Sequence, residues 1–114
     1  MDATQMILLY DYYGELLTKR QQECFDLRYN QDLSLGEIGL ELGISRQGVY
    51  DNLTRTEALL QRMEEKTGCV RRDLQCREAA KKIADIAQVL SHNDDPAVAD
   101  LAKQILGAVA GLEE

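Results

Sequence analysis

Six polar residues between positions 46 and 55 have side chains that could bind the edges of DNA bases or the phosphates beside them. An arginine can donate two hydrogen bonds to guanine, a glutamine can pair with adenine in the same way, and an aspartate can accept a hydrogen bond from cytosine. If this stretch is a helix that reaches into the major groove, residues of its first turns should face base edges and later ones should lie nearer phosphates. The residues expected at base edges are Arg46, Gln47, Tyr50 and Asp51, and those expected nearer phosphates are Thr54 and Arg55.

The residues before this stretch predict a short helix that ends in a sharp turn. Ser34 and Glu37 have the spacing of a capping box, in which each side chain accepts a hydrogen bond from the backbone of the other residue. Ile38 and Leu42 then lie on one side of a helix over residues 35–42. Gly43 can adopt the positive φ angle that commonly ends a helix.

A second helix is predicted over residues 45–67. Ser45 can cap its start, where the free backbone N–H groups could also hold a phosphate. Val49, Leu53 and Leu60 recur at helical spacing and should form its buried face, which leaves the six polar residues outside. The pattern therefore predicts a helix-turn-helix. An αα-hairpin that only builds a core is the alternative.

Two further helices should precede this motif, over residues 3–16 and 19–30. Thr18 and Gln21 form a second capping-box pattern at the start of the helix over 19–30. Lys19, Arg20 and Arg28 on that helix could add phosphate contacts beside the predicted recognition helix. Residues 1–67 thus form the expected helix-turn-helix domain.

Residues 68–114 are expected to form a two-helix C-terminal extension. Asp95 and Pro96 have the residue types of a helix start, and the helix that follows carries apolar residues at alternating spacings of three and four. Such a seam either folds back on residues 70–90 or packs against a second chain, and the two readings are equally supported. The extension is therefore a candidate dimerisation element, and a homodimer is expected. The seam consists of Val98, Leu101, Ile105, Ala108 and Leu112.

Composition favours an all-α protein without catalytic or metal chemistry. The 114 residues include one proline, one phenylalanine, no tryptophan and three cysteines. The cysteines lack metal-ligand spacing and His92 has no ligand-like neighbour, so we expect no metal, no cofactor and no disulfide, with Cys24 in the core. No phosphate-binding loop or nucleophile–base pattern is present, which argues against an enzyme. The absence of a signal segment and of a long apolar run predicts a cytoplasmic protein with no membrane partner.

The formal charge of −7 is unevenly distributed along the chain. Residues 1–60 carry ten acidic and five basic residues, whereas residues 61–82 carry seven basic and four acidic ones. Because phosphate neutralisation supplies much of the affinity for DNA, the acidic first part predicts weak binding by a single domain. The basic stripe over residues 62–82 could contact RNA, but a solvated helix face is its simplest explanation.

Residues 17–38 resemble the last helix-turn-helix domain of bacterial sigma factors, which is sigma factor region 4. The matching stretches are Leu17–Gln21, Leu27–Tyr29 and Ser34–Ile38. Ser45–Glu57, with Glu64–Lys66 after it, strongly resembles the YlxM family of small bacterial proteins, whose genes neighbour those of the signal recognition particle. The resemblance covers about residues 6–67, and beyond it only length and helical character match.

The resemblance implies a DNA-binding regulatory protein of the YlxM type, linked to the signal recognition particle pathway. The alternative that it implies is a protein-interaction module that binds a protein or RNA component of that particle. Two glycines depart from the family pattern. Gly39 and Gly48 stand where alanine is expected, which should weaken their helices by about 0.5–1 kcal/mol each. At Gly39 the missing side chain would also allow two helices to cross closely.

Overall fold

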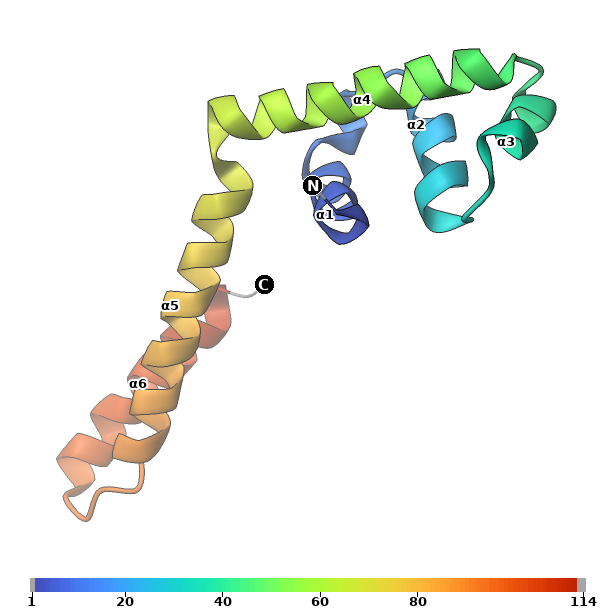
Figure 1. Cartoon of the computed structure of the whole chain (residues 1–114). Helices are drawn as coiled ribbons and strands as arrows, with labels where there is room; N and C mark the ends of the chain where they lie inside the picture. The colour runs from blue at the N-terminus through green and yellow to red at the C-terminus, as the bar shows by residue number, and fades with distance from the viewer. Residues whose placement is uncertain (1, 113–114) are drawn as a thin grey trace. The chain divides into compact units, whose positions relative to one another are not determined.

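A computed structural model describes residues 2–112 of the chain (Figure 1). Over these residues it contains six α-helices and no strand, which confirms the all-α fold. The chain divides into two compact units, Met1–Val70 and Arg71–Glu114.

The first unit contains four complete helices and the first residues of a fifth. The first two end in irregular helical turns, so they differ from the uniform helices expected over 3–16 and 19–30. A 3₁₀ turn, Gly14–Leu16, follows the first helix, and a π-helical segment, Asp26–Asn30, follows the second. The four α-helices are α1 (Ala3–Tyr13), α2 (Lys19–Phe25), α3 (Leu35–Leu42) and α4 (Arg46–Thr67).

Capping boxes begin both helices for which the sequence predicts them. The Thr18 hydroxyl accepts a hydrogen bond from the Gln21 backbone N–H, and Gln21 accepts one from the Thr18 N–H in return. Ser34 and Glu37 make the same pair of bonds at the start of α3. Each pair satisfies two backbone donors that a helix start otherwise leaves without an acceptor.

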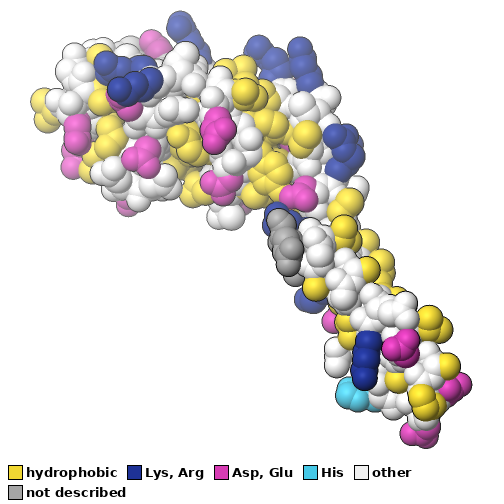
Figure 2. Space-filling model, turned by 180° about the vertical axis from the view of Figure 1, so that it is seen from behind, with side chains coloured by type: hydrophobic (Ala, Val, Ile, Leu, Met, Phe, Trp, Pro, Cys, Tyr) yellow, Lys and Arg dark blue, Asp and Glu magenta, His cyan; other side chains and the backbone are white. Residues whose placement is uncertain are grey.

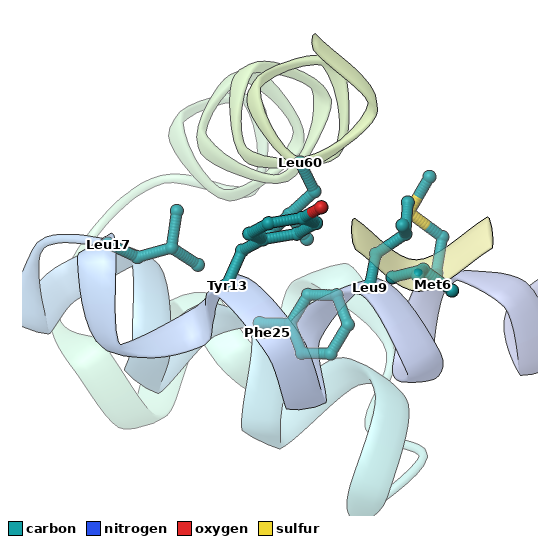
Figure 3. Packing of buried hydrophobic residues seen from close by; sticks show 7 residues of the cluster. Met6, Leu9, Tyr13, Leu17, Phe25 and Leu60 are labelled. Carbon is teal, nitrogen blue, oxygen red and sulfur yellow. The ribbon is translucent and has the colours of Figure 1, made fainter. Parts of the chain in front are cut away.

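Two apolar clusters hold the first unit together, and both include residues of α4. The cluster in Figure 3 joins α1, α2 and α4, where Leu60 of α4 points down towards Tyr13 and Phe25. The Phe25 ring stacks on Tyr10 and on Tyr29, with centroids 4.3 Å apart in each pair. The second cluster joins α2 and the π-helical segment to α3 and the first half of α4. It consists of Cys24, Leu27, Ile38, Val49 and Leu53. The expectation that Cys24 is a core residue is thereby confirmed.

A hydrogen-bonded carboxylate joins α1, α4 and the start of α5 (Cys69–Leu90). The Tyr13 hydroxyl donates to Glu64 Oε1 at 2.5 Å, and the Val70 backbone N–H donates to the same oxygen at 3.0 Å. Gly68, with φ of 62°, ends α4 directly before this point. Val70 is 6% exposed and belongs to the cluster of Figure 3, so this residue of α5 packs within the first unit.

The second unit consists of the rest of α5 and of α6 (Pro96–Leu112), which runs back along it (Figure 1). Asp95 caps α6, because its carboxylate accepts a hydrogen bond from the Ala97 N–H at 2.9 Å. The buried residues of this unit are small: Ala80 and Ala87 of α5, with Ala102 and Val109 of α6. The helix does fold back, but the predicted seam is not its buried line, since Leu101, Ile105 and Leu112 stay 59%, 40% and 77% exposed.

Candidate nucleic-acid interface

The turn between α3 and α4 places the two helices unusually close together. Gly43 adopts φ of 71°, as predicted, and Ile44 and Ser45 complete the corner. A Cβ atom at Gly39 would stand 2.7 Å from the Ile44 carbonyl oxygen and 3.5 Å from the Arg46 nitrogen. The backbone of the turn therefore fills the space of the absent side chain, which confirms the close approach expected at Gly39.

Packing against α1, α2 and α3 fixes which face of α4 meets solvent. Val49, Leu53, Thr56 and Leu60 are buried along one line of the helix. Their burial leaves the opposite side of α4 free over its whole N-terminal half. All six polar residues singled out from the sequence are exposed: Arg46, Gln47, Tyr50, Asp51, Thr54 and Arg55.

These residues are distributed around the outer face rather than gathered on one line. At about 100° per residue, Gln47 and Asp51 lie nearest to the direction opposite the buried line, and Thr54 and Arg55 lie about 50° from that direction on its two sides. Arg46 lies much nearer the buried line, on the side next to α3. A shallow groove on the α3 side is lined by Leu35, Arg46, Gln47 and Tyr50.

Hydrogen bonds already organise the start of this face. The Ser45 hydroxyl caps α4 by accepting from the Gly48 N–H at 2.9 Å. Gln47 Nε2 donates to Asp51 Oδ1 at 3.1 Å, so the two side chains that could read bases are joined. The second amide hydrogen and the carbonyl oxygen of Gln47 can still serve a base edge.

The three basic residues expected near phosphates are exposed, but two of them also bind backbone of the first unit. Arg20 Nη1 donates to the Leu42 carbonyl oxygen at 3.3 Å, at the C-terminal end of α3. Arg28 Nη1 donates to the Leu33 carbonyl oxygen at 3.0 Å, in the turn before α3. Lys19 and Arg20 lie on α2, and Arg28 lies in the π-helical segment directly after it. The hydrogen bonds of the two arginines connect this part of the chain to the two ends of α3.

A tyrosine supports α4 from the π-helical segment. The Tyr29 hydroxyl donates to Glu57 Oε1 at 2.7 Å. Burial, together with this hydrogen bond and the charge of Glu57, raises the pKa of Tyr29 to about 12. The neutral phenol is therefore part of what holds α2 and its extension against α4.

From the sequence, Arg62 and Lys66 belong only to a longer basic stripe over residues 62–82. In the structure that stripe is divided between two helices, because the left-handed Gly68 ends α4. Arg62 and Lys66 are exposed and lie on the same flank of α4 as Arg55, at spacings of seven and four residues. Figure 2 shows Lys and Arg side chains spaced along the edge of the first unit that α4 occupies. Helical periodicity counted onward from Arg55 would have identified them.

Within residues 2–112, His, Cys, Asp and Glu side chains form no group of three or more that could hold a metal ion. Over the same range, the helices lack the combination of length and hydrophobicity needed to cross a bilayer.

Residues 1–99 match the family model of UPF0122, described as "Putative helix-turn-helix protein, YlxM / p13 like". A UPF0122 protein of Acetivibrio thermocellus is 59% identical over 76 residues, which are 67% of this chain and 65% of that protein. One of Thermoanaerobacter sp. is 44% identical over 105 residues, 91% of this chain and 90% of its own length. One of Bacillus cereus is 39% identical over 111 residues, 97% of this chain and 96% of its own length.

Proposed function

This chain belongs to the UPF0122 family of YlxM-like proteins, and we propose that it is a regulatory protein that binds double-stranded DNA through the outer face of α4. The family is a helix-turn-helix family rather than an enzyme family. The observation that carries the proposal is the exposure of Gln47, Asp51 and Thr54 between arginines on the two flanks of a helix whose inner face is fully buried.

This arrangement suits a helix lying in the major groove. Side chains opposite the buried line point at base edges, and those on the flanks approach the phosphates of the two strands. Gln47 and Asp51 are then the residues that read bases, and Arg46 and Arg55 contact the backbone. This assigns Arg46 to a phosphate, whereas the sequence alone had suggested a base edge.

The acidic character of residues 1–60 limits the affinity of a single unit. Each phosphate contact contributes by releasing counterions, and the ten acidic residues of this region oppose that gain. Binding by two linked copies offsets the deficit, because the second contact becomes intramolecular. A homodimer is therefore part of the proposal.

Selection from a random duplex library, followed by fluorescence-anisotropy titration at several salt concentrations, tests the proposal. We expect a preferred sequence, and binding that weakens as salt rises. The double variant Arg46→Ala/Arg55→Ala should lose about 1 unit of salt slope per residue and most of its affinity. The matched control Lys81→Ala/Lys103→Ala removes two exposed cations from the second unit and should keep the sequence preference.

Circular dichroism decides whether any loss of binding comes from unfolding. Arg46 and Arg55 are exposed, so the double variant should keep the helical spectrum and thermal stability of the parent. If the parent protein binds no duplex beyond the level of this variant at low salt, the DNA proposal is wrong.

One feature of the surface favours a second candidate function, docking on a component of the signal recognition particle. Leu40 on α3 is 87% exposed and lies on the acidic first unit. Glu37 and Glu41 are exposed on the same helix, three residues before Leu40 and directly after it, and an apolar contact flanked by carboxylates suits a basic partner protein. A pull-down with the purified particle, comparing the parent with Leu40→Glu, tests this candidate independently of DNA.

A further inference from the structure

The second unit exposes large apolar side chains on both of its helices. The term apolar face is used below for six of them. On α5 these are Ile83, Ile86 and Leu90, which are 48%, 63% and 39% exposed. On α6 they are Leu101, Ile105 and Leu112, which are 59%, 40% and 77% exposed.

The two halves of the apolar face lie on one side of the hairpin. On α5 the exposed residues are about 70–80° round the helix from the buried line of Ala80 and Ala87, at about 100° per residue. On α6 they are about 70–80° from the line of Ala102 and Val109, in the same rotational sense when each helix is viewed from its own N-terminus. Because the helices are antiparallel, the same sense places both stripes on the same side.

The hairpin buries too little to hold itself together in isolation. Three of its four buried apolar residues are alanines, and most of the larger apolar side chains are exposed, with Val98 and Leu106 half-buried. In a four-helix bundle the helices pack around a shared core of large apolar side chains. Two hairpins that meet through the apolar face would enclose such a core.

Charge indicates that the partner is a second copy in the opposite direction. Residues 71–82, at the end of the hairpin where α5 begins, carry five basic and two acidic residues. Residues 83–103, which include the turn at the other end, carry four acidic residues and Lys103 as the only basic one. An antiparallel pair therefore sets a net +3 segment against a net −3 segment twice, whereas a parallel pair sets like charges together.

We propose that two copies of this chain associate through the apolar faces of α5 and α6, forming an antiparallel four-helix bundle. The interface is isologous, since each copy presents the same face to the other. This inference does not depend on DNA binding.

Size-exclusion chromatography with light scattering on the full-length protein tests the association. The parent chain should have the mass of two chains. The variant Ile83→Glu/Ile105→Glu puts a carboxylate into each half of the apolar face, and should raise the dissociation constant at least about 100-fold, giving one chain. The control Val89→Glu changes a residue that is 74% exposed and about 90° from the face, and should remain a dimer.

A charge exchange tests the antiparallel direction without touching the apolar core. Arg72→Glu alone should weaken the dimer about tenfold, and so should Asp94→Arg alone. Combined in one chain, the two changes should restore the parent affinity. The glutamate introduced at position 72 of one copy then faces the arginine introduced at position 94 of the other. Asp95 is left unchanged because it caps α6.

The other possible occupants of the face predict a different result from a second copy. A parent protein with the mass of one chain would overturn the proposal, as expected if the face packs on the first unit or on a different protein. A double-glutamate variant that is still a dimer would also overturn it. A charge-exchanged variant weaker than both single variants would exclude the antiparallel direction. None of these measurements uses DNA. A monomeric parent protein would remove the homodimer from the proposed function but would not contradict DNA binding through α4.

Discussion

The Ile44 carbonyl oxygen occupies the position where a side chain at Gly39 would begin, 2.7 Å from the ideal Cβ. The contact is with backbone, which cannot move aside as the end of a flexible side chain can. An alanine here would improve the intrinsic helix propensity of α3, but it would separate α3 from the turn that leads into α4. The two effects oppose each other, and their sizes determine the outcome.

We predict that Gly39→Ala destabilises the protein. Overpacking costs about 1–3 kcal/mol and the gain in helix propensity is about 1 kcal/mol, so the net loss should be about 1 kcal/mol. Urea denaturation followed by circular dichroism measures it. Gly36→Ala in the same helix is the control, since its Cβ would have Ser34 Oγ as its nearest neighbour at 4.0 Å, and it should be neutral or stabilising. A stabilised Gly39→Ala would contradict the observed packing.

This site shows how far the sequence could predict the fold. Local signals were sufficient for the caps at Thr18 and Ser34, for the turn at Gly43 and for the buried line of Val49 and Leu53. The sequence also led us to expect that alanine at residue 39 would strengthen α3. The contact with the Ile44 carbonyl, which opposes that gain, could not be predicted because its position depends on how the whole turn folds.

The candidate interface was less predictable than the fold. Burial periodicity correctly placed all six polar residues of α4 outside. It could not reveal that Arg20 bonds the end of α3, because that contact joins residues 22 positions apart. Nor could the seam of α6 be resolved, since Leu101 and Ala102 are neighbours and only packing decides which of them is buried.

Arg20→Ala should lower stability even in the absence of DNA. Loss of its exposed hydrogen bond to the Leu42 carbonyl should cost about 0.5–1 kcal/mol. The adjacent Lys19→Ala removes the same charge and should change stability by less than about 0.5 kcal/mol. Thermal denaturation of the two variants side by side measures the difference, and equal effects would argue against a bracing role for Arg20.

Stability should fall at high pH because of Tyr29. Its pKa is raised to about 12 in the folded protein, above the ordinary value of 10.0. The folded state thus disfavours ionisation, so this contribution is complete below about pH 10 and is lost as the pH rises through about 12. Burial raises the pKa values of Tyr10 and Tyr13 as well, which adds to the same trend.

Replacing Tyr29 isolates its share of this alkaline loss. Tyr29→Phe removes the hydrogen bond to Glu57 and should cost about 1 kcal/mol at neutral pH. Its denaturation midpoint should then fall less steeply between about pH 10 and about pH 12 than that of the parent. An identical pH profile in both proteins would remove Tyr29 as the cause.

Arg62 and Lys66 should contribute affinity for DNA without contributing sequence preference. If both contact phosphates, Arg62→Ala/Lys66→Ala should reduce the slope of log affinity against log salt by about 0.9 per residue. Every duplex sequence should weaken by a similar factor. Titration of the preferred and a scrambled duplex shows whether their ratio is preserved.

Gln47→Ala should have the opposite effect. Loss of a base contact should reduce discrimination by about 1–3 kcal/mol at one position of the site and leave the salt slope almost unchanged. Repeating the library selection with the variant identifies that position. A uniform loss over all sequences would instead place Gln47 at the phosphate backbone.

A twofold dimer determines the symmetry of the DNA site that it can bind. In the antiparallel bundle proposed above, the first residues of the two α5 helices, each 22 residues long, stand at opposite ends of the bundle. Because an isologous pair has twofold symmetry, a binding site made of two inverted half-sites would have the matching symmetry.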